Sequence, residues 1–220
     1  MTDHRQPAHV MSIIQHVRST AFTLTVAAVV IVVQFVPGLP ALLESDLHAI
    51  QAGQVWRLVT GYLSHWSLDH LFWDVLMFVV LGCVIESRSR WRMIGLCLAS
   101  ALAISAGIAF WRTDIVLCRG LSGIDTALFT YAAMATLGVA VTQKNWRHGL
   151  VAALLLTAFC GKVLYESLVG SALFADSAGA GFHVVVEAHL IGAAIGLLAG
   201  LGTSWWRPRV WAPQTELSVS

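Results

Sequence analysis

Six long apolar segments restrict the folds that this chain can adopt. They cover about residues 20–36, 70–85, 93–111, 122–141, 150–165 and 183–202. A membrane-spanning helix needs roughly 20 mostly apolar residues. Hydrophobic residues make up 57% of the chain and charged residues only 11%, whereas a soluble domain is about 25% charged. The sequence therefore predicts an all-α polytopic membrane protein with six transmembrane helices.

Short polar ends flank these segments. We expect residues 1–19 to form a cytoplasmic arm, residues 20–206 a six-helix membrane domain, and residues 207–220 a cytoplasmic tail. No small-residue cleavage site accompanies the first segment, so we expect it to stay in the protein rather than be removed as a signal peptide. The connections are too short to hold a soluble domain.

The distribution of Lys and Arg predicts an orientation. If the amino terminus is cytoplasmic, nine of these residues fall on the inner side and four on the outer side. The inner nine are Arg5, Arg18, Arg88, Arg90, Arg92, Lys144, Arg147, Arg207 and Arg209, and the outer four are Arg57, Arg112, Arg119 and Lys162. Cytoplasmic loops carry the excess of Lys and Arg, so both termini are predicted to be cytoplasmic.

Ser122 and His189 lie near the starts of the fourth and sixth segments. Lipid offers no water to satisfy either side chain, so the pair indicates nucleophilic chemistry inside a membrane, with the serine activated by the histidine. In the predicted orientation both residues fall in the outer half of the bilayer. His70 and Asp74, at the start of the second segment, fall at the same level.

Small residues indicate how the two helices could meet. Gly192, Gly196 and Gly200 follow His189 on its own helix face, where they would let another helix approach closely. Gly123, with Ala127 and Thr130, forms a similar smooth surface beside Ser122. Packing of these two surfaces would bring the hydroxyl and the imidazole within hydrogen-bonding reach.

These motifs, in this order on the second, fourth and sixth helices, resemble the rhomboid family of intramembrane serine proteases. The resemblance covers most of the chain from residue 56 onward. It rests on Trp56, Arg57, His65, the stretch from His70 to Asp74, Gly82, Glu86, Gly120-Leu121-Ser122-Gly123 and Ala188-His189-Leu190. Residues 119–123 and 187–190 are most similar to the compact bacterial branch called rhombosortase. Membership would imply a bacterial inner membrane protein whose active site faces the outer side.

The resemblance implies a catalytic Ser122–His189 dyad and no metal or other cofactor. It implies an oxyanion hole near the turn of Gly120 and Leu121, with donors from His70 and the backbone amide of Ser122. Asp74 departs from the family, which usually carries Asn at this position. Its carboxyl group either stays protonated and donates, or pairs with His70 one turn away.

Four further residues are candidates for shaping the site. We expect His65 at the outer interface, where it shapes a loop or touches substrate, and Gly123 beside the nucleophile. Glu187 either pairs with His183 at a helix boundary or orients His189. Asp125, one turn past Ser122, either supports the site from behind Ser122 or bonds to a neighbouring helix, and we expect the second. By analogy with the family, the outer end of the fifth helix, with Lys162, Tyr165 and Glu166, forms a movable wall.

The expected substrate is a transmembrane segment of another protein, cut within the segment or next to it. The rhombosortase likeness implies an exported protein with a carboxyl-terminal, glycine-rich sorting segment. The main alternative is a rhomboid-like protein that binds membrane proteins without cutting them. A weaker alternative is a metal or haem site with ligands from His70, Asp74, His183, Glu187 and His189. A transporter is another weaker alternative. No nucleic-acid partner is expected, and the sequence does not predict an oligomeric state.

Overall fold

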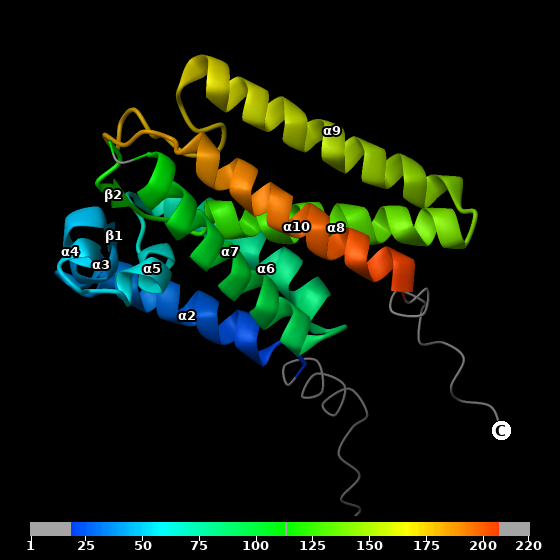
Figure 1. Cartoon of the computed structure of the whole chain (residues 1–220), viewed down its shortest axis with the longest axis horizontal. Helices are drawn as coiled ribbons and strands as arrows, with labels where there is room; N and C mark the ends of the chain where they lie inside the picture. Colours follow the sequence, from blue (N-terminus) through cyan, green and yellow to red (C-terminus); the bar gives the residue numbers. More distant parts are fainter. Residues whose placement is uncertain (1–18, 113, 207–220) are drawn as a thin grey trace, which may run out of the picture.

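Six long helices, short helical turns and a small two-stranded ladder make up residues 19–112 and 114–206, the part of the chain that this computed structural model describes (Figure 1). The long helices are α2 (Ala21–Phe35), α6 (Leu68–Glu86), α7 (Arg90–Trp111), α8 (Ser122–Thr142), α9 (Trp146–Val169) and α10 (Val186–Trp206). The short elements are α3 (Leu39–Leu43), β1 (Ser45–Asp46), α4 (Leu47–Gln51), α5 (Arg57–Thr60), η1 (Gly61–Leu63) and β2 (Leu117–Cys118). The predicted all-α membrane bundle is confirmed.

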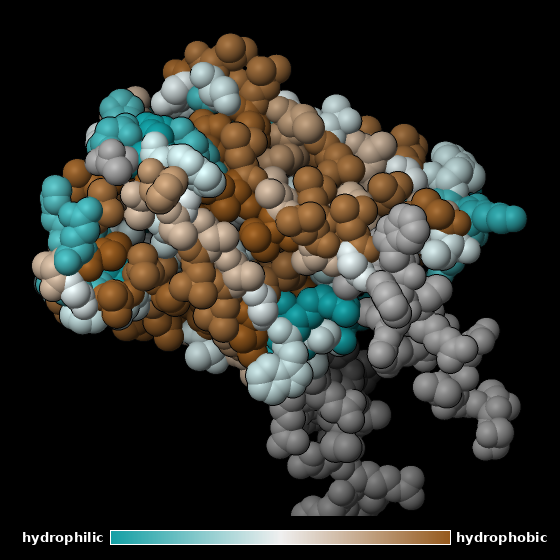
Figure 2. All heavy atoms as spheres, in the orientation of Figure 1, coloured by the Kyte–Doolittle hydropathy of each residue, from teal (hydrophilic) through white to brown (hydrophobic). Residues whose placement is uncertain are grey.

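The long helices have the length and composition of membrane spans. Helices α6, α7, α8 and α9 are each long and apolar enough to cross a bilayer, and two shorter apolar helices cover Ala21–Phe35 and Val186–Gly202. Figure 2 shows hydrophobic residues over the middle of this face and hydrophilic residues towards the ends of the helices. The chain is thus an integral, multi-pass membrane protein. Of the predicted terminal arms, residues 1–18 and 207–220 lie outside the described residues.

Capping residues explain where several helices begin and end. The hydroxyl of Ser67 accepts a hydrogen bond from the amide of His70, 3.3 Å away, so α6 begins before the predicted residue 70. Helix α9 is longer than predicted, with Asn145 as its N-cap and Gly170 in the left-handed conformation at its end. The predicted start of the last helix at residue 183 is wrong, because α10 begins at Val186.

Glu86, at the end of α6, holds the start of α2. Its carboxylate accepts bonds from the amides of Phe22 (3.0 Å) and Thr23 (2.7 Å) and from the Thr23 hydroxyl (2.8 Å). Arg90 adds an ion pair at 3.0 Å. The first amides of a helix have no partner within it, and a carboxylate both satisfies them and complements the helix dipole. This contact fixes α2 against α6 at the end of the bundle opposite β1 and β2.

Helices α8 and α10 pack closely along the glycine face of α10 (Figure 1). A Cβ atom at Gly192 would overlap the carbonyl oxygen of Gly123, and one at Gly196 would overlap the carbonyl oxygen of Ala127. One at Gly200 would overlap the side chain of Met134. Only glycine allows this backbone separation, so the glycines set how near Ser122 comes to His189.

Candidate active site

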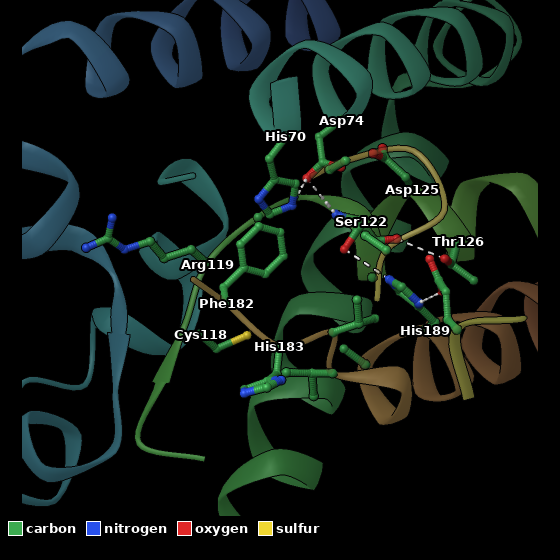
Figure 3. A pocket seen from close by; sticks show the side chains of 18 of the residues that line it. His70, Asp74, Cys118, Arg119, Ser122, Asp125, Thr126, Phe182, His183 and His189 are labelled. Carbon is green, nitrogen blue, oxygen red and sulfur yellow. Dashed lines mark hydrogen bonds and ion pairs between the residues drawn. The ribbon is translucent and has the colours of Figure 1, made fainter. Parts of the chain in front are cut away.

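Ser122 is the first residue of α8, and the turn before it requires glycine. Gly120 has φ +108°, and a Cβ there would lie 2.7 Å from the imidazole of His70 and 3.0 Å from Asp74 Oδ2. Any other residue would therefore be strained by its backbone and would also collide with α6. The Oγ atom of Ser122 lies 3.1 Å from Nε2 of His189 (Figure 3). This is hydrogen-bonding distance for transfer of the hydroxyl proton.

The other ring nitrogen of His189 faces a carboxylate. Its Nδ1 lies 2.9 Å from Oε2 of Glu166 on α9, and the side chains of both residues are almost fully buried. Lys162 Nζ lies 2.7 Å from the same Oε2 and 3.4 Å from Nδ1. A carboxylate only accepts hydrogen bonds, so the shorter contact assigns the proton to Nδ1 and leaves the Nε2 lone pair for the serine.

The sequence places Glu166 only in a movable wall and offers Glu187 as the carboxylate that could orient His189. Within residues 19–112 and 114–206, Glu187 forms an ion pair with Arg112 and none with His183 or His189. His183 precedes α10 instead of lying one turn away on it. The signal that could have revealed Glu166 is the Lys162–Glu166 spacing of i,i+4 within an apolar segment, where charges are rare and usually functional.

Asp74 lies among hydrogen-bond donors. Its Oδ2 accepts from the amides of Leu121 (2.8 Å) and Ser122 (3.1 Å). The same oxygen lies 3.1 Å from Nε2 of His65 and 3.3 Å from Nε2 of His70. Four nitrogen atoms around one oxygen fit a carboxylate that accepts hydrogen bonds. Of the two roles expected for Asp74, the contact with His70 matches pairing with that histidine rather than donation by a protonated carboxyl group. Asp74 therefore occupies two of the donors expected for an oxyanion hole.

His65 lies in the loop before α6 and is fully buried, with its ring edge-on against His70 and hydrogen-bonded to Asp74. One other expectation needs correction. Asp125 does not bond to a neighbouring helix. Within residues 19–112 and 114–206, neither of its buried carboxyl oxygens has a hydrogen-bond partner, although the residue lines the active-site cavity.

A cavity of about 770 Å³ opens over the Ser122–His189 pair. Aromatic side chains form much of its wall, namely Trp66, Trp73, Phe129, Phe159, Phe174 and Phe182. The connection between α9 and α10, residues 170–185, lines part of it, and we name it the cap loop. Phe182 of this loop stacks on His70 at 5.0 Å and 14° (Figure 3). Aromatic residues thus form much of the wall, but charged residues line the cavity away from the nucleophile as well, among them Arg112, Asp114 and Arg119.

The cap loop is also tied down by polar contacts. The amide of Asp176 donates to Asp69 of α6 at 2.6 Å, and the amide of Leu173 donates to Glu166 Oε1 at 3.3 Å. On the other side of the cavity, Arg119 stacks over Trp66 at 4.4 Å and pairs with Glu44 at 2.7 Å. Among the described residues, no group of three His, Cys, Asp or Glu side chains is arranged to hold a metal ion.

Comparisons with known proteins agree on one family. The model of the Rhomboid domain matches residues 52–206, which is more than half of the chain. Rhomboid-like protease 2 of Toxoplasma gondii is 23% identical over 158 residues, which cover 69% of this chain and 49% of that protein. The chain thus spans about half the length of this curated relative.

Proposed function

Because the chain belongs to the rhomboid family, we propose that it is an intramembrane serine endopeptidase working through a Ser122–His189 dyad. The observation that carries this proposal is the 3.1 Å contact between Ser122 Oγ and His189 Nε2 beneath a cavity. The name of the Toxoplasma relative, a rhomboid-like protease, supports the same activity. The rhombosortase branch is a finer proposal, which rests on residues 119–123 and 187–190.

The chemistry is acyl transfer from a peptide bond. Ser122 Oγ forms a bond to the substrate carbonyl carbon while its proton passes to His189 Nε2. The carbon–nitrogen bond then breaks, and Nε2 returns the proton to the leaving amine. Water repeats the two steps and frees Ser122. His189 alternates between base and acid, so either substitution should remove the whole activity.

Stabilisation of the tetrahedral intermediate depends on Asp74. The amide of Ser122 and the ring of His70 would donate to the oxyanion, but in the free site both face the Asp74 carboxylate. An oxyanion and a carboxylate repel each other, so Asp74 has to give up these donors or take a proton as the intermediate forms. Asn in its place would remove this conflict.

The proposed substrate is a transmembrane segment of another protein, cut inside the outer leaflet or next to it. Such a helix must unwind to expose a peptide bond, and glycine lowers the cost of unwinding. A carboxyl-terminal, glycine-rich sorting segment followed by a membrane helix fits this requirement and is the rhombosortase-like proposal. We further propose a bacterial inner membrane location, with both termini cytoplasmic and the site facing outward, on the Lys and Arg distribution.

Labelling with a fluorescent fluorophosphonate tests the dyad. The purified full chain in detergent is compared with Ser122→Ala and His189→Ala, and each variant is checked for an unchanged thermal melt. We expect labelling of the wild type alone. Substantial labelling of the His189 variant would rule out the dyad, and a folded wild type that is not labelled would count against the protease.

The second candidate is a rhomboid-like protein that binds membrane proteins without cutting them. One observation favours it, since Asp74 occupies donors that a protease needs for its intermediate. The two functions differ when a glycine-rich transmembrane protein is co-expressed with the wild type or with Ser122→Ala. A protease releases a shortened product that Ser122→Ala does not release. A binder leaves the partner intact, and its association with the partner survives the substitution.

A further inference from the structure

Helix α9 carries an unusual buried residue. Along its 24 residues only Ala152 and Glu166 are buried, so the helix lies at the edge of the bundle with most of its surface exposed. An ion pair buried at such a place is weak evidence for stability, because desolvation of both charges offsets their attraction. The position of Glu166 therefore calls for another explanation, and its contact with His189 supplies one.

We propose that Glu166 is a positioning residue for His189, so that the dyad works as a Ser–His–Glu triad whose third member comes from α9. This inference rests on the proposed protease function. Glu166 Oε2 lies 2.9 Å from His189 Nδ1, on the opposite side of the ring from Ser122. A carboxylate at this place holds the ring in orientation, selects the Nδ1–H tautomer and stabilises the imidazolium formed when the serine proton arrives.

Three donors from three parts of the chain hold Glu166 in place. They are His189 on α10, Lys162 one turn earlier on α9, and the amide of Leu173 in the cap loop. The carboxylate is thus fixed before any substrate binds, as an orienting group must be. Two of these donors share Oε2, so the side chain cannot rotate without losing both contacts.

Lys162 makes the role of Glu166 testable, because the two side chains favour opposite tautomers of the same ring. Lys162 Nζ lies 3.4 Å from Nδ1, and an ammonium group can only donate hydrogen bonds. With Glu166 present, the ammonium pairs with the carboxylate. Without Glu166, the ammonium would donate to Nδ1, move the ring proton to Nε2 and leave no lone pair to accept the proton of Ser122.

The experiment measures the fluorophosphonate inactivation rate and, with a transmembrane substrate, kcat and KM. We expect Glu166→Ala to lower the inactivation rate and kcat by about 100-fold or more, within the usual range for a general base, with KM nearly unchanged. The double variant Glu166→Ala, Lys162→Met should recover about tenfold relative to Glu166→Ala, because the competing donor is gone. If Glu166 had a purely structural role, the double variant would not recover activity, because it loses Lys162 as a second buried partner.

Controls separate failure of this inference from failure of the protease proposal. Glu187→Ala removes the carboxylate that is nearer in sequence but does not contact His189, and should leave the inactivation rate and kcat unchanged. Nearly wild-type activity in Glu166→Ala, or a double variant no more active than Glu166→Ala, would overturn the role of Glu166 while leaving the dyad intact. A folded wild type that is inactive towards both probe and substrate would overturn both proposals.

Discussion

Asp74→Asn tests how the carboxylate competes with the reaction intermediate. The change keeps the size of the side chain and one acceptor oxygen for the amides of Leu121 and Ser122, but it removes the charge. Asn also brings an NH₂ group that can donate to an oxyanion. The two donors that the intermediate needs, Ser122 N and His70 Nε2, lie 3.1 and 3.3 Å from the present carboxylate oxygen.

The size of the effect follows from these two contacts. A hydrogen bond to a charged group contributes about 1 kcal/mol more than one between neutral groups. Releasing two donors from Asn rather than from Asp should therefore cost about 2 kcal/mol less, which corresponds to a rate up to about 30-fold higher. We expect Asp74→Asn to react with fluorophosphonate at least as fast as the wild type, and up to this limit.

The assay compares inactivation rates of wild type, Asp74→Asn and a control, Asp46→Asn, which neutralises the carboxylate that caps α4 and is not among the described residues that line the cavity. Thermal melts in the same detergent report folding. A fall of more than tenfold in Asp74→Asn at an unchanged melting temperature would refute this reasoning and assign the carboxylate a role of its own.

Three further results are expected. Gly196→Ala should lower the melting temperature by several degrees, because overpacking costs about 1–3 kcal/mol, whereas Gly202→Ala, with open space around it, should not. Glu86→Ala should destabilise the bundle by about 1–3 kcal/mol in the same melts, since it leaves buried helix amides unpaired. Burial raises the pKa of the Cys118 thiol to about 11, so maleimide labelling followed by mass spectrometry should be slow at pH 8 and rise about tenfold per pH unit to pH 10. A plateau below pH 9 would contradict that.

The sequence predicted the helices well because a bilayer leaves few choices. Long apolar runs must form helices to pair their own amides, and the six predicted segments match the six long helices to within a few residues. The largest misplacements are of four residues, at both ends of α9 and at the end of α10, and the start of α10 is misplaced by three. There, the capping by Asn145 and Gly170 and the non-helical conformation of His183 decide the boundaries, and hydropathy does not report them.

The site could be predicted only where its residues follow a pattern within one helix. The spacing of Gly192, Gly196 and Gly200 from His189 is such a pattern. The contact between His189 and Glu166 follows no such pattern, because Glu166 lies on another helix. Glu187, two residues from His189 in sequence, was the wrong candidate. The donors gathered around Asp74 come from α6, the turn before α8 and the loop before α6, so no single stretch of sequence reveals them.

Because the helices are packed unequally, the properties of the bilayer can affect the geometry of this site. Ser122 and His189 stand on α8 and α10, whose backbones pack closely at Gly192 and Gly196. Glu166 stands on α9, which packs against the rest of the bundle at few residues and is exposed along most of its length. A change in membrane thickness or lateral pressure would act first on α9. Lipid composition would therefore change the position of Glu166, and with it the turnover rate, while the distance between Ser122 and His189 stays the same.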